Sequence, residues 1–195
     1  MKKSVFISAI ALAGLIGCSG TGAPIDEIIT GVSDQDYSNT TTDTIKDDFL
    51  NAINDARAHD QDCGTEGVFS ATTALTWSDE LYNAAYEHSK DMAESNTFDH
   101  DGSGTATDIT AIDNSLSRGS YPNERVEYNG YTYSITGENI AAGQTTLDEV
   151  IAGWLESDGH CANLMNPDYE NVGMAYYKKD GSTYTHYWTQ NFAAH

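Results

Sequence analysis

Two histidines and one glutamate are the residues whose types and surroundings could do chemistry. His100 follows a predicted helix, Glu138 lies in Gly137-Glu138-Asn139-Ile140, and His160 follows Gly159, which is expected to end another helix. Turn positions of this kind expose polar side chains where a cleft can form. Two imidazoles and a carboxylate can hold zinc and leave one coordination position for water. We therefore expect a cleft with a possible divalent metal, zinc first and calcium or magnesium second; the alternative is three ordinary hydrogen-bonded side chains.

The cysteines suggest a disulfide. Cys63 and Cys161 would pair outside the cytoplasm, where disulfides persist, if Cys18 is used otherwise. An alternative interpretation makes Cys161, which directly follows His160, a catalytic thiolate. We favour the disulfide, because a pair of free cysteines in an exported protein would tend to oxidise.

The first residues have the pattern of an export signal. Lys2 and Lys3 supply positive charge, and residues 5–17 form an uncharged run too short to span a bilayer comfortably as a mature helix. The end of this run, Leu15-Ile16-Gly17-Cys18, resembles the lipobox of bacterial lipoproteins. That resemblance implies a protein anchored to a membrane by a lipid on Cys18, facing the periplasm or the cell exterior, at the outer membrane if the cell is Gram-negative. The alternative is a plain secretion signal with an incidental cysteine.

The chain of 195 residues divides into three parts. We predict a lipoprotein signal peptide over residues 1–17, a lipidated cysteine and flexible tether over 18–43, and one domain over 44–195. The chain carries 9 Lys and Arg against 30 Asp and Glu, a net charge of −21, which argues against nucleic acid as a partner. Hydrophobic residues make up 39% of the chain, enough to build a core.

Helical spacing dominates the first part of the domain. It predicts a helix over about 44–56 with Thr44 and Asp47 as a capping pair, and a second helix that begins at Ser78. A third helix is expected over 109–116, and a fourth from Thr146, with Glu149 three residues on, to Gly159.

Strand signals gather near the C-terminus. Asn129-Gly130 separates Tyr-rich segments, and Asp180-Gly181 predicts a two-residue hairpin turn between 172–178 and 183–192. Helices followed by a late antiparallel pair indicate an α+β fold.

Five segments in order resemble the CAP superfamily of cysteine-rich secretory, antigen 5 and pathogenesis-related proteins, in its bacterial SCP-like branch. They cover roughly residues 44–193 and comprise Leu75-Thr76-Trp77-Ser78-Asp79-Glu80-Leu81, Phe98-Asp99-His100, Gly137-Glu138-Asn139-Ile140-Ala141, Trp154-Leu155-Glu156-Ser157-Asp158-Gly159-His160-Cys161-Ala162-Asn163-Leu164-Met165-Asn166-Pro167 and Tyr187-Trp188-Thr189-Gln190-Asn191-Phe192.

The resemblance implies an α-β-α sandwich with a central, mainly antiparallel sheet and a cleft lined by two His and two Glu that often bind a metal. Carried over, these are His100, Glu138 and His160. Ser157 stands where eukaryotic members have the second Glu, with Glu156 one residue before it. Glu156 and Ser157 are therefore auxiliary candidates.

The sequence leaves several functions open. The first is an exported, lipid-anchored binding or interaction module for a small ligand, a lipid or an envelope component. The second is a metal-dependent, peptidase-like hydrolase that uses the same cleft, with a metal-bound water as nucleophile. The third is a structural envelope protein. No nucleophile motif is recognisable, so we lean away from an enzyme.

Overall fold

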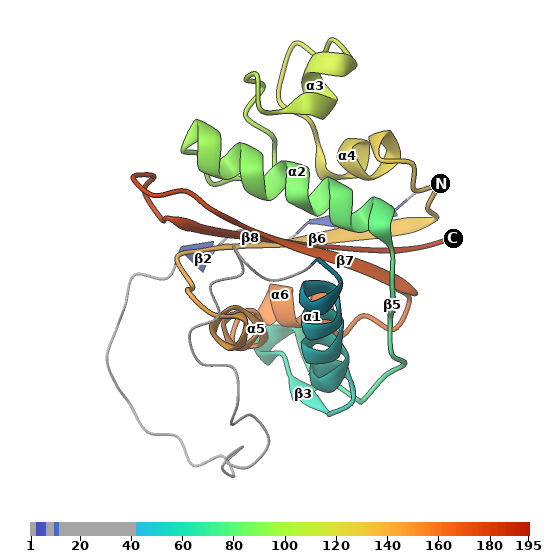
Figure 1. Ribbon diagram of the computed structural model, residues 1–195. Helices are drawn as coiled ribbons and strands as arrows, with labels where there is room; N and C mark the ends of the chain where they lie inside the picture. Colours follow the sequence, from blue (N-terminus) through green and yellow to red (C-terminus); the bar gives the residue numbers. More distant parts are fainter. Residues whose placement is uncertain (1–2, 7–9, 12–41) are drawn as a thin grey trace.

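One mixed β-sheet lies between two layers of helices (Figure 1). The computed structural model describes residues 3–6, 10–11 and 42–195. The main strands run in the order β1–β6–β8–β7–β5, and a further short strand, β2, also pairs with β6. β6, β8 and β7 are antiparallel, whereas β1, β2 and β5 join the sheet in parallel. The strands are β1 (Lys3–Phe6), β2 (Ile10–Ala11), β5 (Thr76–Trp77), β6 (Ile135–Ala142), β7 (Asn171–Lys178) and β8 (His186–Ala194).

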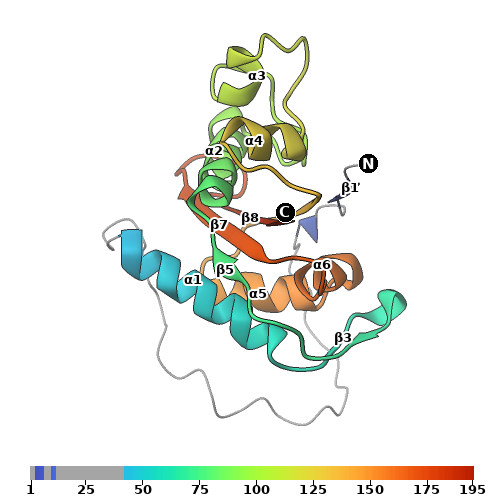
Figure 2. The ribbon, with the colours of Figure 1, turned by 90° about the vertical axis from the view of Figure 1, so that its right-hand side faces the viewer.

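The helices divide between the two faces of this sheet (Figures 1 and 2). One layer holds α2 (Asp79–Ser95), α3 (Ile109–Asp113) and α4 (Pro122–Tyr128), and the other holds α1 (Thr42–Arg57), α5 (Leu147–Leu155) and α6 (Asp158–Leu164). A small ribbon of β3 (Gln61–Asp62) and β4 (Val68–Phe69), joined through the 3₁₀ helix η2 (Gly64–Glu66), follows α1. The predicted α+β fold, an α-β-α sandwich with a mainly antiparallel sheet, is confirmed.

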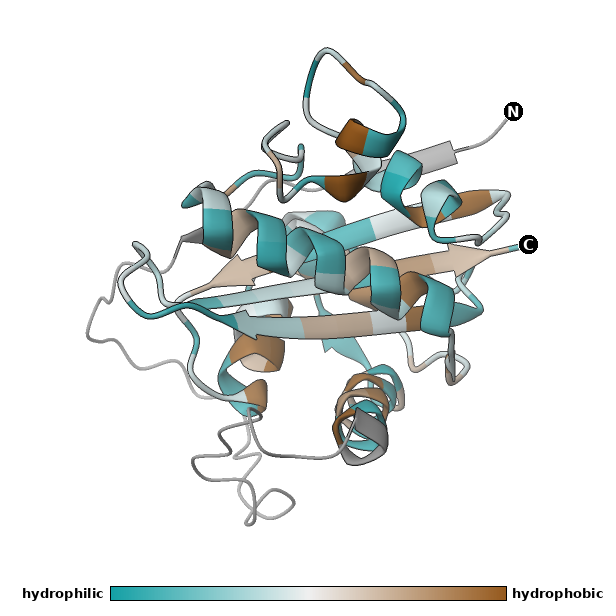
Figure 3. Cartoon of the chain, turned by 45° about the horizontal axis from the view of Figure 1, so that its top comes forward, coloured by the Kyte–Doolittle hydropathy of each residue, from teal (hydrophilic) through white to brown (hydrophobic). Residues whose placement is uncertain are grey.

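Most of the apolar core lies between the sheet and the layer of α1, α5 and α6. Phe49, Trp154, Trp188 and Phe192 are buried there. Burial of each such side chain stabilises the fold by roughly 1.5–3 kcal/mol. On the other face, Gly173 allows α2 to approach β7, because a Cβ there would lie 2.0 Å from the backbone nitrogen of Tyr82. In Figure 3, α2 presents mainly hydrophilic residues on the side that faces away from the sheet.

The capping signals place two helices correctly. The Ser78 hydroxyl accepts a hydrogen bond from the backbone N–H of Leu81 at the start of α2. Thr146 and Glu149 form a capping box at the start of α5. The first helix begins earlier than predicted, at Thr42, so Thr44 lies inside it rather than at its N-cap.

Two predicted helix ends are wrong. α3 stops at Asp113 after one turn and a half, and Ile109 and Ile112 are 44% and 52% exposed, so they mark no buried helical face. The fourth helix ends at Leu155 rather than at Gly159. Gly159 instead lies in α6, whose first turn begins after the extended Ser157.

The turn predictions need correction as well. Lys178 pairs with His186, so residues 179–185 form a longer loop in which Asp180-Gly181 is only one part. Gly130 has a left-handed φ of 98° and follows α4, so the Tyr-rich segment before it is a helix. Pro122 in the first turn of α4 was the signal for that helix.

The disulfide prediction is confirmed. Cys63, before η2, is bonded to Cys161 in α6, across 98 positions of sequence. Cys161 therefore has no thiolate, and its interpretation as a catalytic nucleophile is wrong.

The N-terminal predictions fall mostly outside the described residues. Cys18 and the tether up to residue 41 lie there, whereas parts of the predicted signal segment form β1 and β2. Among the described helices, none combines the length and apolar character that a membrane span requires.

Candidate functional site

β6 carries the central residues of the candidate site. Successive side chains of a strand point to opposite faces of the sheet, so Glu138 and Asn139 contact different helix layers. Glu138 contacts Arg125 of α4 and His100 in the loop after α2. Asn139 donates to the backbone oxygen of His160 in α6. The expectation that Glu138 stands in a turn is wrong: it is a fully buried strand residue.

Gly137 makes room for the contacts behind this strand. A Cβ at this position would lie 2.2 Å from the Tyr169 hydroxyl and 2.6 Å from Asn163 Oδ1. Tyr169 donates to Asn163 Oδ1, and Asn163 Nδ2 donates to Asn139 Oδ1. This buried polar chain ties β6 to α6, and each of its members has a partner, as burial requires.

Both carboxylate oxygens of Glu138 are occupied. Oε1 accepts a hydrogen bond from His100 Nδ1 at 2.8 Å, and Oε2 forms an ion pair with Arg125 at 2.9 Å. Burial alone would raise the pKa of Glu138, but the charge of Arg125 and the bond from His100 outweigh it and lower that pKa to about 2. Glu138 is therefore ionised, and its charge is balanced inside the protein.

His100 is held in one orientation by Glu138. Its Nδ1 donates to the carboxylate, which fixes the orientation of the ring. The His100 side chain is 13% exposed, whereas those of Glu138 and Arg125 are buried. The carboxylate thus orients an imidazole that is reachable from solvent. Such an imidazole can accept a hydrogen bond from a ligand or take a proton.

His160 reaches the same site from the opposite helix layer. It is 1% exposed, and neither ring nitrogen has a hydrogen-bond partner among the described residues. Burial, followed by the nearby His100, lowers the pKa of His160 to about 4. The ring is therefore neutral at pH 7, and its two nitrogens are polar groups available to a ligand or a water.

The three predicted site residues do not form a metal-binding set in this arrangement. Glu138 is committed to His100 and Arg125, and the described residues contain no group of three or more His, Cys, Asp or Glu that could hold a metal ion. Two histidines without a carboxylate ligand are a poor site for zinc, calcium or magnesium. The roles given below to these three residues therefore require no metal ion.

The auxiliary candidates lie near His160 in sequence, but among the described residues neither forms a hydrogen bond or ion pair with Glu138. Ser157 precedes α6 without capping it through its side chain, and Glu156 is exposed at the end of α5. Asp158, the other carboxylate beside them, accepts hydrogen bonds from the backbone and hydroxyl of Thr65. These bonds connect Asp158 to η2, so its carboxylate has partners other than the site residues.

Sequence reasoning missed two residues of the site. His88, on the buried face of α2, donates from Nε2 to the backbone oxygen of Asp99 and lies 3.9 Å from Glu138 Oε1. Arg125 binds Glu138, the backbone oxygens of His100 and Ser120, and the hydroxyl of Ser120. A fully buried arginine requires a partner, but the sequence gives no sign that this partner is Glu138.

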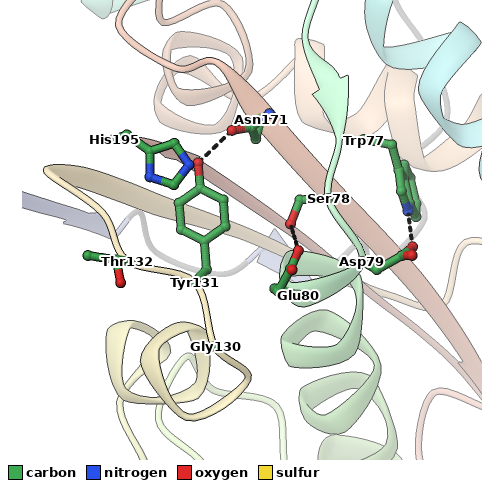
Figure 4. Close-up of a pocket in the computed structure, with 9 residues that line it drawn as sticks. All are labelled: Trp77, Ser78, Asp79, Glu80, Gly130, Tyr131, Thr132, Asn171 and His195. Carbon is green, nitrogen blue, oxygen red and sulfur yellow. Dashed lines mark hydrogen bonds between the residues drawn. The ribbon is translucent and has the colours of Figure 1, made fainter.

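A separate hollow of about 520 Å³ lies elsewhere on the surface (Figure 4). Tyr131 stacks on His195 there, and Asp79 accepts from the indole of Trp77. None of His100, Glu138 and His160 lines this hollow. It is not the cleft that the sequence predicted.

Two curated proteins are similar to this chain in sequence. The chain is 36% identical to the uncharacterized protein YkwD of Bacillus subtilis over 112 residues, which are 57% of this chain and 36% of YkwD. It is 32% identical to the uncharacterized membrane protein YlbC of Bacillus subtilis over 118 residues, which are 60% of this chain and 28% of YlbC. The chain thus spans about a third of the length of these curated relatives.

A solved structure shares the architecture. The crystal structure of an extracellular protein containing a SCP domain from Bacillus anthracis superposes with a TM-score of 0.55 and 24% identity. The superposition covers 81% of this chain and 45% of that one. The model of the cysteine-rich secretory protein family, CAP, matches residues 50–192. Because this match spans well over half of its length, the chain belongs to the cysteine-rich secretory protein (CAP) family.

Proposed function

We propose that this protein is an exported, lipid-anchored binding module whose ligand site is the cleft around His100, Glu138 and His160. The observation that carries this proposal is the buried contact of Glu138 with Arg125 and His100, which holds the partly exposed His100 ring in one orientation. Cys161 is locked in a disulfide. The metal-dependent hydrolase that the sequence left open has no ligand set to support it among the described residues.

Export is supported by independent features. The disulfide persists outside the cytoplasm, and the structurally similar protein of Bacillus anthracis is described as extracellular. A lipid on Cys18 would hold the domain at a membrane facing the periplasm or the cell exterior, and at the outer membrane in a Gram-negative cell. In cells fed an alkyne fatty acid, the wild type should take up the label and Cys18→Ser should not. Equal labelling of both would contradict the anchor.

The binding function is tested by thermal shift on residues 18–195 carrying Cys18→Ser, the form that the sequence predicts to remain after export. The probes are anionic lipid micelles, peptidoglycan fragments and a mixed peptide library. We expect one class to raise the Tm of the wild type by at least 2 °C and to have less effect on His100→Asn. His59→Asn is the matched control, since His59 is exposed and far from the site in sequence.

Two results would contradict this proposal. If no probe class shifts the wild type, the cleft does not bind envelope components. If mass spectrometry finds probes cleaved by the wild type and intact after incubation with Glu138→Gln, the protein is a hydrolase.

A further inference from the structure

The outer edge of β6 is covered by the N-terminal segment of the chain. β1 pairs with β6 in parallel from Lys3 opposite Ile135 to Phe6 opposite Glu138, and β2 continues with Ile10 opposite Ala141 (Figure 1). These strands belong to the segment that the sequence predicts to be removed on export. Its loss would expose the hydrogen-bonding edge of β6.

β6 lacks the features that normally protect an edge strand. Natural edges are short, or carry lysines, prolines or bulges that prevent pairing with another chain. β6 extends over eight residues without Lys, Arg or Pro, and its only charged side chain, Glu138, is bound to Arg125 and His100. The strand at the other edge, β5, has only two residues. The sheet is therefore protected at the β5 edge, and without β1 and β2 its β6 edge would be open to pairing with another strand.

We infer that the edge of β6 is a groove that binds an extended, uncharged peptide in parallel register by strand addition. This inference rests on the proposed binding function and names the class of its ligand. In the full chain, Lys3–Phe6 and Ile10–Ala11 fill the groove, and loss of residues 1–17 opens it.

The segment that fills the groove indicates the chemistry of the ligand. It carries no charged residue from Ser4 to Ala11, and backbone hydrogen bonds to β6 supply its affinity. The register places Phe6 opposite Glu138, so a peptide in this groove passes the strand position that holds His100. Two copies of β6 related by a two-fold axis would run antiparallel. The parallel pairing therefore favours a peptide over a second copy of the chain.

The test compares the full chain with residues 18–195 carrying Cys18→Ser. The clusters of the apolar core among the described residues lie between Ile45 and Ala193, so the shorter form keeps them. The probe is a fluorescent peptide with the sequence of residues 4–11, which carries no charged side chain. We expect it to bind the shorter form at least tenfold more tightly than the full chain, in which the same segment competes from within.

Hydrogen exchange locates the bound peptide. The bound peptide should slow amide exchange in β6 at least tenfold and leave the exchange rates in β7 unchanged. The control peptide carries Val5→Pro and Phe6→Pro, which removes backbone donors, and it should bind at least tenfold more weakly.

Three results would overturn the inference: equal binding of both peptides, unchanged exchange in β6, or a dimer of the shorter form in which β6 is protected without peptide. None of these results concerns cleavage or the dependence on His100, so they leave the test of the proposed function separate.

Discussion

His160 should make the protein sensitive to acid. Its ring is buried, and its pKa is lowered from 6.5 to about 4. A group with a depressed native pKa must stay neutral in the folded state while the unfolded chain takes up a proton. The resulting loss of stability begins as the pH falls through 6.5 and is complete below 4. At pH 5 it amounts to about 2 kcal/mol from this residue alone.

Urea unfolding at pH 7.0 and pH 5.0 measures this effect. His160→Phe removes the titrating group and keeps an aromatic ring in the buried position. The free energy of unfolding of this variant should fall by about 2 kcal/mol less between the two pH values than that of the wild type. His59→Gln is the control, because His59 is exposed and its replacement should leave the wild-type difference unchanged.

Comparing two pH values removes the packing cost of the substitution, which acts equally at both. His88 remains in both proteins, and burial also lowers its pKa, to about 3, so each keeps part of the acid sensitivity. If His160→Phe loses as much stability as the wild type, His160 is protonated in the native protein. Its burial would then be compensated by a partner, and the buried part of the cleft would not be neutral.

Other substitutions test the remaining contacts through unfolding measurements. Arg125→Met leaves Glu138 buried without its ion pair and should cost about 3–5 kcal/mol, whereas adding Glu138→Gln should recover part of that loss. Cys63→Ser should cost about 4–5 kcal/mol and expose one thiol to a thiol reagent, and two reactive thiols in the native wild type would contradict the disulfide. Gly137→Ala should cost about 1–3 kcal/mol through overpacking, while Gly153→Ala, in an uncrowded helical position, should be neutral or stabilising.

The parts of the fold that follow from local rules could be predicted from the sequence. Ser78 and the Thr146–Glu149 pair mark helix starts because their side chains satisfy backbone N–H groups within three residues. The late antiparallel strands follow from their Tyr- and Trp-rich composition. These signals depend on neighbours in sequence, and the structure confirms them.

The environment of Glu138 could not be predicted in the same way. Its partners Arg125 and His100 lie 13 and 38 positions away, so no local pattern connects them to it. A strand containing Gly, Glu and Asn also has weak β-propensity, so the sequence of this segment favours a turn. Tertiary burial overrides that preference, because both polar side chains find partners in opposite helix layers.

The charges of the site also explain why the missing second glutamate matters. The family resemblance implies two glutamates, which would leave a negative site suited to a cation. Here Ser157 replaces one of them, and Arg125 alone balances the other. With His88 and His160 both kept neutral by burial, the buried groups carry no net charge. The proposed peptide ligand fits such a site, because the hydrogen-bonding groups of a peptide backbone are neutral.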